Sequence, residues 1–115
     1  MVYYKGFKKA RLRGYQKTTC SQGHSHDSRA EAGYCDELHA LLRAGEIQEI
    51  KQQKTFDFVV NGKKICGHRV DFMVKTNEGI WEVHEVKGFG TEIWRIKHKL
   101  FEALYPEIPY HVIRV

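Results

Sequence analysis

The sequence predicts a small α/β domain with one mixed sheet flanked by helices, in the order helix, three strands, helix, strand. Two stretches carry apolar residues at helical spacing, and the extended sequence between them is interrupted by turn dipeptides. A chain of 115 residues is long enough for one core and short for two. We therefore expect one domain at residues 27–115, preceded by a basic arm at residues 1–26.

The first helix is expected to begin near Ser28. Ser28 and Glu31 have the spacing of a capping box. Gly45 is well placed to end this helix. The polar residues 20–28 before it predict a loop. The apolar positions at helical intervals are Tyr34, Leu38, Leu41 and Leu42.

Three strands are expected between residues 47 and 86. The first runs from Ile47 to Val60 and ends at Asn61-Gly62, a dipeptide preferred in tight hairpin turns. The second runs from about Lys63 to Lys75, and the turn 77–79 separates it from the third, at residues 80–86. These three strands form an antiparallel meander.

A second helix and a final strand complete the domain. Thr91 can cap this helix, and Pro106 and Pro109 end it before a strand at residues 110–115. Its expected buried stripe consists of Ile93, Ile96, Leu100 and Leu104. A helical crossover from the third strand to the last makes those two strands parallel and the connection right-handed.

The chemistry-bearing residues are expected at the ends of two adjacent strands. Alternation along the second strand places Val70, Phe72 and Val74 on one face and leaves Asp71 on the other. Glu85 and Lys87 share a face of the third strand, nearly symmetric with Asp71 about the turn. Carboxylate oxygens are ligands that Mg²⁺ prefers, and a lysine can stabilise charge on a phosphate. Alone the pattern is weak, because a cross-strand ion pair gives the same residues.

In this context the chain resembles the PD-(D/E)XK nuclease superfamily, with its restriction-endonuclease-like αβββαβ core. It is most similar to small phage proteins of that superfamily, including the DUF1064 family and the endonuclease I type of Holliday-junction resolvase. The resemblance covers residues 27–115. It is carried by Asp27-Ser28-Arg29-Ala30-Glu31-Ala32, Val70-Asp71-Phe72, Glu85-Val86-Lys87-Gly88 and the basic helix at residues 94–101.

The resemblance implies a role for each site residue. Asp71 and Glu85 would hold Mg²⁺ or Mn²⁺, and Lys87 would act at the attacking water. Glu31 would be the acid on the first helix that contacts metal directly or through water, although the capping box also explains a glutamate there. Val70 replaces the proline that gives the motif its name, as in many members of the superfamily.

Nucleic-acid contacts are expected from two basic segments. The arm has six basic residues and no acid before residue 27, with aromatic residues between them, whereas the rest of the chain has 13 basic and 14 acidic residues, so all of the excess in the net charge of +5 lies in the arm. This mixture suits phosphate contacts and stacking, and a solubilising tail is the alternative. The basic face of the second helix suits a phosphate backbone or plain solvation. The residues are Lys5, Lys8, Lys9, Arg11, Arg13 and Lys17 in the arm, and Arg95, Lys97 and Lys99 in the helix.

The three cysteines have irregular spacing, which argues against a disulfide framework. Cys20, His24 and His26 have the chemistry of zinc ligands, and Cys35 or His39 could complete a set. Their spacing fits no standard zinc finger, so a polar loop is the plainer interpretation.

Together these patterns predict a metal-dependent endonuclease that cuts branched DNA in phage replication or recombination. Symmetric cutting of two strands would make it a homodimer. The alternatives are a nuclease for linear or single-stranded DNA, and a DNA-binding module without catalysis. No apolar run is long enough to cross a membrane and no signal peptide is evident, so a cytoplasmic location, in the host if the protein is phage-encoded, is expected.

Overall fold

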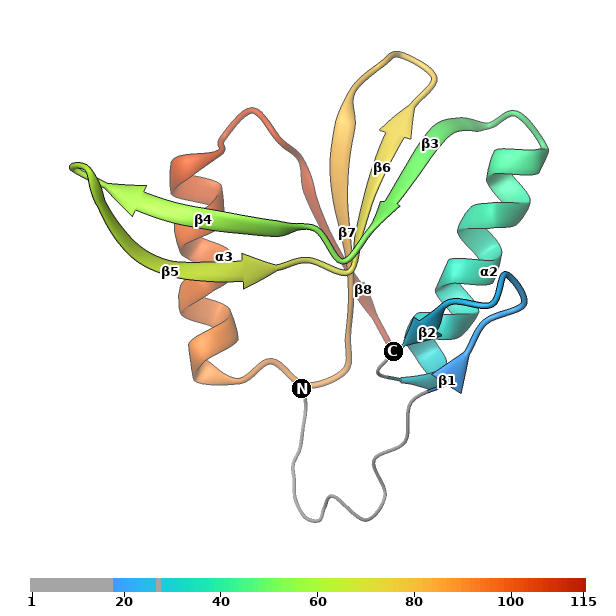
Figure 1. The fold of residues 1–115 in the computed structure, drawn as a ribbon, viewed down its shortest axis with the longest axis horizontal. Coiled ribbons are helices and arrows are strands. Elements are labelled where there is room, and N and C mark those ends of the chain that lie inside the picture. The colour runs from blue at the N-terminus through green and yellow to red at the C-terminus, as the bar shows by residue number, and fades with distance from the viewer. Residues whose placement is uncertain (1–17, 27) are drawn as a thin grey trace, which may run out of the picture.

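The computed structural model describes residues 18–26 and 28–115, and a four-stranded mixed sheet forms its centre (Figure 1). The strand order is β3-β6-β7-β8. Neighbouring strands are antiparallel except β7 and β8, which are parallel, as predicted. The strands are β3 (Ile47–Gln52), β6 (Phe72–Thr76), β7 (Trp81–Lys87) and β8 (Tyr110–Arg114). The predicted α/β class with a mixed sheet is confirmed.

Different elements cover the two faces of this sheet. Helix α2 (Arg29–Arg43) lies on one side, whereas α3 (Glu92–Leu104) and a second hairpin lie on the other (Figure 1). That hairpin consists of β4 (Thr55–Val60) and β5 (Lys63–Arg69), which pair only with each other. Alternation along β6 serves both cores, because Phe72 and Val74 pack toward α2 while Met73 packs toward Phe101 of α3.

The long strands predicted at residues 47–60 and 63–75 are each broken in two, and this prediction was wrong in that respect. The breaks lie opposite each other at residues 53–54 and 70–71, which we call the bend. Gln53 N–H donates to the Asp71 carbonyl at 2.9 Å, and Val70 N–H donates to the Lys54 carbonyl at 2.9 Å. Gln53 has a left-handed φ of 53°. One long hairpin thus changes direction without losing its pairing.

The bend changes the surroundings of two predicted residues. Val70 is fully buried with Met73 on the α3 side, and does not share the face of Phe72 and Val74 as predicted. Asp71 lies in the bend and not within a strand. The cause is that strict alternation holds only within a continuous strand, and the chain turns between residues 69 and 72.

Both helices begin where their capping residues predict. The Ser28 hydroxyl accepts the Glu31 N–H at 3.1 Å, and the Thr91 hydroxyl accepts the Trp94 N–H at 3.1 Å. Gly45 follows α2 with a left-handed φ of 78°, which glycine adopts most easily. Neither described helix is long and apolar enough to cross a membrane.

The predicted buried stripe of α3 was wrong in its first half. Ile93 and Ile96 are 68% and 57% exposed, whereas Trp94 and Phe101 are buried. Aromatic packing determines this rotation of the helix. The ring centroid of Phe101 lies 4.9 Å from that of Phe56 and 5.0 Å from that of Tyr110. Leu100 and Leu104 are partly buried against the same core.

Residues 18–26 form a small hairpin where a loop was predicted. Its strands are β1 (Thr18–Thr19) and β2 (Ser25–His26), and both contact α2. The segment that precedes the expected domain boundary at residue 26 is therefore partly built into the fold. The six basic residues predicted to contact DNA from the arm lie outside the described residues: Lys5, Lys8, Lys9, Arg11, Arg13 and Lys17.

Candidate active site

The four residues predicted to form a catalytic site come together at the bend. Asp71 belongs to the bend itself, and its Oδ2 accepts the backbone N–H of Val86 in β7 at 2.9 Å. Glu85 and Lys87 flank Val86 on β7, and Glu31 comes from the first turn of α2. The carboxylates of Glu31 and Glu85 both raise the pKa of Asp71. We call these four residues the acidic site.

Burial and like charge together oppose ionisation of the acids. Burial is the largest cause that raises the pKa of Asp71 to about 8, and the charges of Glu85 and Glu31 add to it. The Val86 N–H and the Lys87 ammonium act in the opposite direction. Burial likewise raises the pKa of Glu85, which is 5% exposed. Without a bound cation, the three acids therefore resist being ionised together at neutral pH.

Lys87 supplies the positive charge of the site. Its Nζ lies 5.3 Å from the centroid of the Trp94 ring, within range of a cation–π contact. Burial lowers the pKa of Lys87, while the carboxylates of the acidic site act to raise it. Gly90 permits this arrangement, because a Cβ at that position would lie 3.1 Å from the Trp94 ring. A lysine is thus held beside the acids by a ring that packs on glycine.

Two residues that sequence reasoning missed hold Glu85 in place. The Tyr110 hydroxyl donates to Glu85 Oε1 at 2.6 Å, and His68 Nε2 lies 2.9 Å from the Tyr110 oxygen. Since the single hydroxyl proton of Tyr110 goes to Glu85, His68 donates from Nε2. Burial lowers the pKa of His68 to about 4, so the imidazole is neutral. The one sequence signal for Tyr110 was the predicted parallel pairing of the third and last strands. In the structure this pairing sets Tyr110 opposite Val83, two residues before Glu85.

The carboxylate of Glu31 turns away from its helix toward the β1–β2 hairpin. Its Oε2 lies 2.9 Å from His26 Nδ1, and Gln53 Nε2 donates to the same oxygen at 3.4 Å. The helix cap is made by the backbone N–H of Glu31 and the Ser28 hydroxyl. Ser28 therefore caps α2, while the Glu31 side chain, 6% exposed, contributes charge to the acidic site. The carboxylate bonds to His26 and Gln53, so among the described residues only the Ser28 half of the expected capping box is formed.

Two further groups of side chains in the described part of the chain could hold a metal ion. One is Cys20, His24, His26 and Cys35, and the other is Glu82, His84 and His111. Within each group the ligand atoms all lie within 4.8 Å of one another. The carboxylates of the acidic site are not such a group. The structure thus offers side chains that could hold a metal ion, in groups other than the predicted Asp71, Glu85 and Glu31, whose role as ligands stays a prediction.

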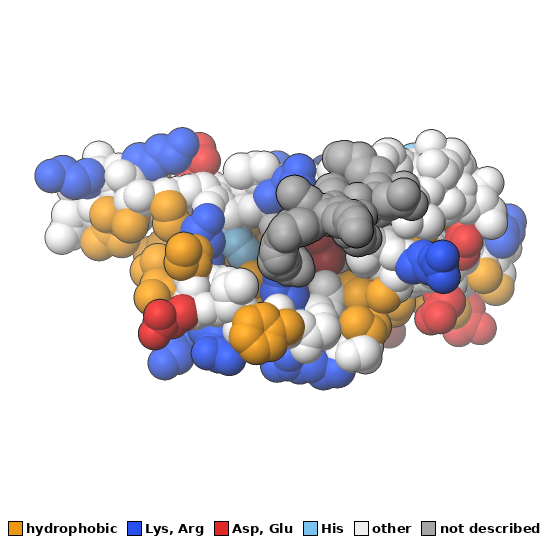
Figure 2. Space-filling model, turned by 90° about the horizontal axis from the view of Figure 1, so that it is seen from below, with side chains coloured by type: hydrophobic (Ala, Val, Ile, Leu, Met, Phe, Trp, Pro, Cys, Tyr) orange, Lys and Arg blue, Asp and Glu red, His pale blue; other side chains and the backbone are white. Residues whose placement is uncertain are grey.

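Basic residues of α3 lie beside the acidic site. Arg95 and Lys99 are exposed and line a groove that also includes Trp94 and Arg114. Lys97 is close enough to the site for its charge to lower the pKa of His68. Figure 2 shows Lys and Arg side chains along the lower edge of this face, with hydrophobic side chains between them. The basic surface predicted on α3 thus lies next to the site.

Residues 12–115 match a family model described as a protein of unknown function (DUF1064). The match spans most of the chain, so the chain belongs to this family, as the sequence predicted. No curated protein and no solved structure matches. Membership of a nuclease superfamily stays a prediction, to be argued from the site.

Proposed function

We propose that this DUF1064 protein is a divalent-metal-dependent nuclease that hydrolyses phosphodiester bonds in DNA. The observation that carries the proposal is the acidic site, where three carboxylates and one lysine from three separate segments share a largely buried volume. Such a group is unfavourable for stability alone, because burial and mutual repulsion raise the pKa of two of the acids. A bound cation would remove that penalty and would also attract an anionic phosphodiester.

The donor set fits Mg²⁺ or Mn²⁺. Asp71 and Glu85 offer hard carboxylate oxygens, and Mg²⁺ is usually held by one or two carboxylates while it keeps several waters. The acids therefore need not close into a compact cage. When bound, the ion would polarise the phosphoryl group and lower the pKa of a water. Glu31 would add a further acid, directly or through water.

The remaining site residues would orient the reacting groups. Lys87, held beside the acids over the Trp94 ring, would orient the attacking water or stabilise charge that develops on the phosphate. Tyr110 and His68 would fix the carboxylate of Glu85, as outer partners of ligands commonly do. The chain itself would thus supply positioning groups and one positive charge, at Lys87.

Three features favour DNA as the substrate. The groove beside α3 carries Arg95, Lys99 and Arg114, which suit a phosphate backbone. Phe89, two residues beyond Lys87, is 72% exposed and offers a ring for stacking on an unpaired base. The basic arm adds charge at the amino end. An unpaired base and a basic arm both suit branched DNA, and cutting two strands symmetrically would require a homodimer.

The test is cleavage of a labelled four-way junction and its matching linear duplex, with Mg²⁺, with Mn²⁺ or with chelator. The variants are Lys87→Ala and, as a matched control, Lys75→Ala. Lys75 is also a partly buried strand lysine near a tryptophan, 5.9 Å from the Trp81 ring centroid. We expect metal-dependent cutting of the junction that is lost in Lys87→Ala and retained in Lys75→Ala.

Other outcomes separate the alternatives. Equal cutting of junction and duplex by a monomer would keep the nuclease and remove the preference for branched DNA. Light scattering of the protein with and without junction DNA measures the oligomeric state. Binding of DNA without cleavage in any metal, unchanged in Glu85→Ala, would replace the nuclease by a non-catalytic binding module.

A further inference from the structure

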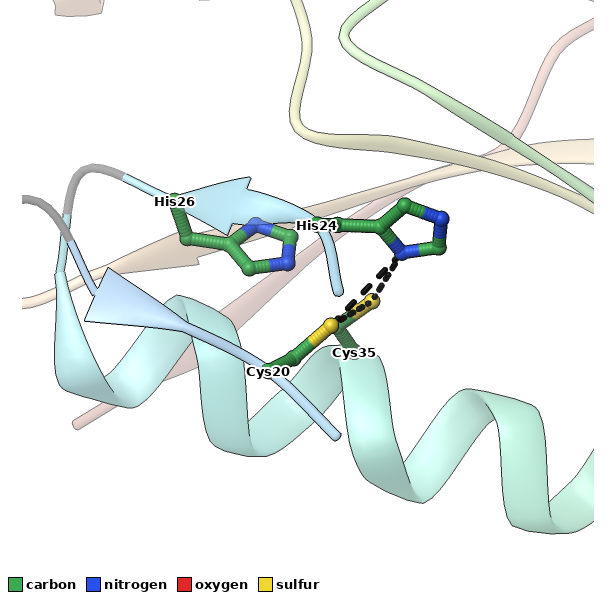
Figure 3. A group of neighbouring side chains, drawn as sticks. All are labelled: Cys20, His24, His26 and Cys35. Carbon is green, nitrogen blue, oxygen red and sulfur yellow. Dashed lines mark hydrogen bonds between the residues drawn. The ribbon is translucent and has the colours of Figure 1, made fainter. Parts of the chain in front are cut away.

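A second set of ligand-type side chains lies between the β1–β2 hairpin and α2. Cys20 follows β1, His24 and His26 come from the second half of the hairpin, and Cys35 comes from α2. Their ring nitrogens and sulfur atoms point into one volume (Figure 3). We call these four residues the Cys/His cluster. Two of these residues offer thiols and two offer imidazoles, which together form a mixed set of soft ligands.

The distances within the cluster are those of ligands around one ion. The sulfur atoms of Cys20 and Cys35 are 3.6 Å apart, and His24 Nδ1 lies 3.6 Å and 3.5 Å from them. Tetrahedral zinc with ordinary bond lengths separates two sulfurs by about 3.8 Å and a sulfur and a nitrogen by about 3.6 Å. A disulfide would need sulfurs at about 2.05 Å. The arrangement matches a metal centre and not a crosslink.

His26 contributes a buried ring nitrogen to the cluster. It is fully buried, and its Nδ1 lies 2.9 Å from Glu31 Oε2. Its Nε2 has no hydrogen-bond partner in the described part of the chain. A buried polar atom of this kind is unfavourable unless something satisfies it. Zinc-bound histidines commonly bind the ion with one nitrogen and donate from the other to a carboxylate, as His26 donates to Glu31.

The neighbouring histidine has a different role. His39 Nδ1 also lies near Cys35 Sγ, at 3.6 Å, but it bonds to the Cys35 backbone carbonyl at 2.8 Å. Its Nδ1 is therefore already used within α2. His24 Nδ1 has a hydrogen-bond partner as well, Gln52 Nε2 at 2.8 Å, which an ion would replace. His39 thus serves as the control residue for the cluster.

We propose that Cys20, His24, His26 and Cys35 bind one Zn²⁺ in a closed tetrahedral site that joins the β1–β2 hairpin to α2. All four protein ligands are present, which is typical of structural zinc and leaves no position for a substrate. The site also fixes the His26 ring that bonds to Glu31, so it positions one carboxylate of the acidic site. The inference stands on the cluster alone and does not depend on nuclease activity.

The test uses the full chain, purified under reducing conditions and stripped of metal with a chelator. Titration with Co²⁺ reports thiolate ligands by their charge-transfer absorption and tetrahedral geometry by intense visible bands. Native mass spectrometry with Zn²⁺ gives the number of ions. We expect one ion per chain, with both spectral features, in the wild type and in the controls Cys66→Ala and His39→Ala, and no such binding in Cys35→Ser.

A second variant covers the case in which Cys35→Ser does not fold. His24 is partly exposed, so His24→Ala should fold, keep both thiolates and bind Co²⁺ at least about tenfold more weakly with altered visible bands. The proposal would be overturned by a wild type that binds no ion. It would also be overturned by cobalt spectra without a thiolate band, or by unchanged binding in His24→Ala.

Discussion

The acidic site and the Cys/His cluster are joined by one hydrogen bond, between Glu31 and His26. The two groups differ in how closely their possible ligand atoms lie together. The Cys/His cluster brings four ligand atoms within 4.8 Å of each other. The acidic site does not, and its carboxylates lie beside a basic groove along α3. The ligand atoms of the Cys/His cluster thus surround one small volume, whereas the acidic site lies next to a surface groove.

This difference matches the two ways in which proteins use metals. Soft thiolate and imidazole ligands in a complete tetrahedral set hold zinc for stability, whereas carboxylates with open positions hold hard cations for reactions at phosphate. If both proposals hold, a single small domain carries two metal sites with separate tasks. Variants in each site show whether metal binding at the Cys/His cluster and cleavage at the acidic site depend on each other.

The largest expected effect is on cleavage. Glu85→Gln removes a proposed ligand without changing the size of the side chain, and the Tyr110 hydroxyl can still donate to it. We expect the cleavage rate to fall by about 10²-fold or more, because a positioned group at the reacting phosphate is lost. Cobalt binding at the Cys/His cluster should be unchanged. Glu49→Gln, an exposed strand acid, is the control for the cleavage assay.

Zinc removal should lower stability. A chelator that removes zinc from the Cys/His cluster would also remove the link between the β1–β2 hairpin and α2. We therefore expect Tm to fall by roughly 10 °C or more, since 1 kcal/mol corresponds to about 4–8 °C for a domain near this size. Calorimetry with added Zn²⁺ or chelator measures the shift. An unchanged Tm, or an equal shift in Cys35→Ser, would contradict a structural role.

Glu31→Gln tests the link between the sites. Glu31 bonds to His26 and contributes charge to the acidic site, so its loss should affect both. We expect cobalt affinity to fall by about 10-fold, as for other outer partners of metal-bound histidines, together with slower cleavage. Glu37→Gln, an exposed acid on the same helix, should change neither. A variant that affects only cleavage would make the two sites independent.

The smallest effect should be a gain in stability. Asp71→Asn removes one of the mutually repelling buried carboxylates and keeps an oxygen that can accept the Val86 N–H. In chelator at neutral pH we expect unfolding to become about 1–2 kcal/mol less favourable, at the expense of cleavage. Asp57→Asn, at an exposed position of β4, should change stability by less than about 0.5 kcal/mol. A destabilised Asp71→Asn would show that the carboxylate is needed structurally.

The sequence was most informative where structure is decided locally. Ser28 and Thr91 start helices by their own side chains, and Asn61-Gly62 makes its turn with two left-handed residues, at φ 51° and 76°. The bend had no such signal, because no glycine or proline lies there and Gln53 adopts its left-handed φ within the folded hairpin. Continuous strands were therefore predicted across it.

The site was predictable in its acids and not in its supports. Asp71, Glu85 and Lys87 lie close in sequence across one turn, so pairing of two strands brings them together. Tyr110, which bonds to Glu85, lies 25 residues from it along the chain. His68, which bonds to Tyr110, lies 42 residues from Tyr110. Partners at such separations depend on how α3 and β8 pack, which local patterns do not specify. The residues of the Cys/His cluster were recognised as candidate zinc ligands, but their spacing fits no standard zinc finger, so a polar loop was preferred and the contact of the hairpin with α2 was not predicted.

The bend has a consequence for how this fold can vary. It separates the β4–β5 hairpin from the central sheet, so the tip at Asn61-Gly62 extends beyond the part of the chain that holds Asp71 (Figure 1). Residues added in pairs on both sides of that tip would preserve the side-chain alternation of both strands. The length of this projection can therefore change between related proteins, and with it the reach of the molecule along a bound partner, while the acids stay in place.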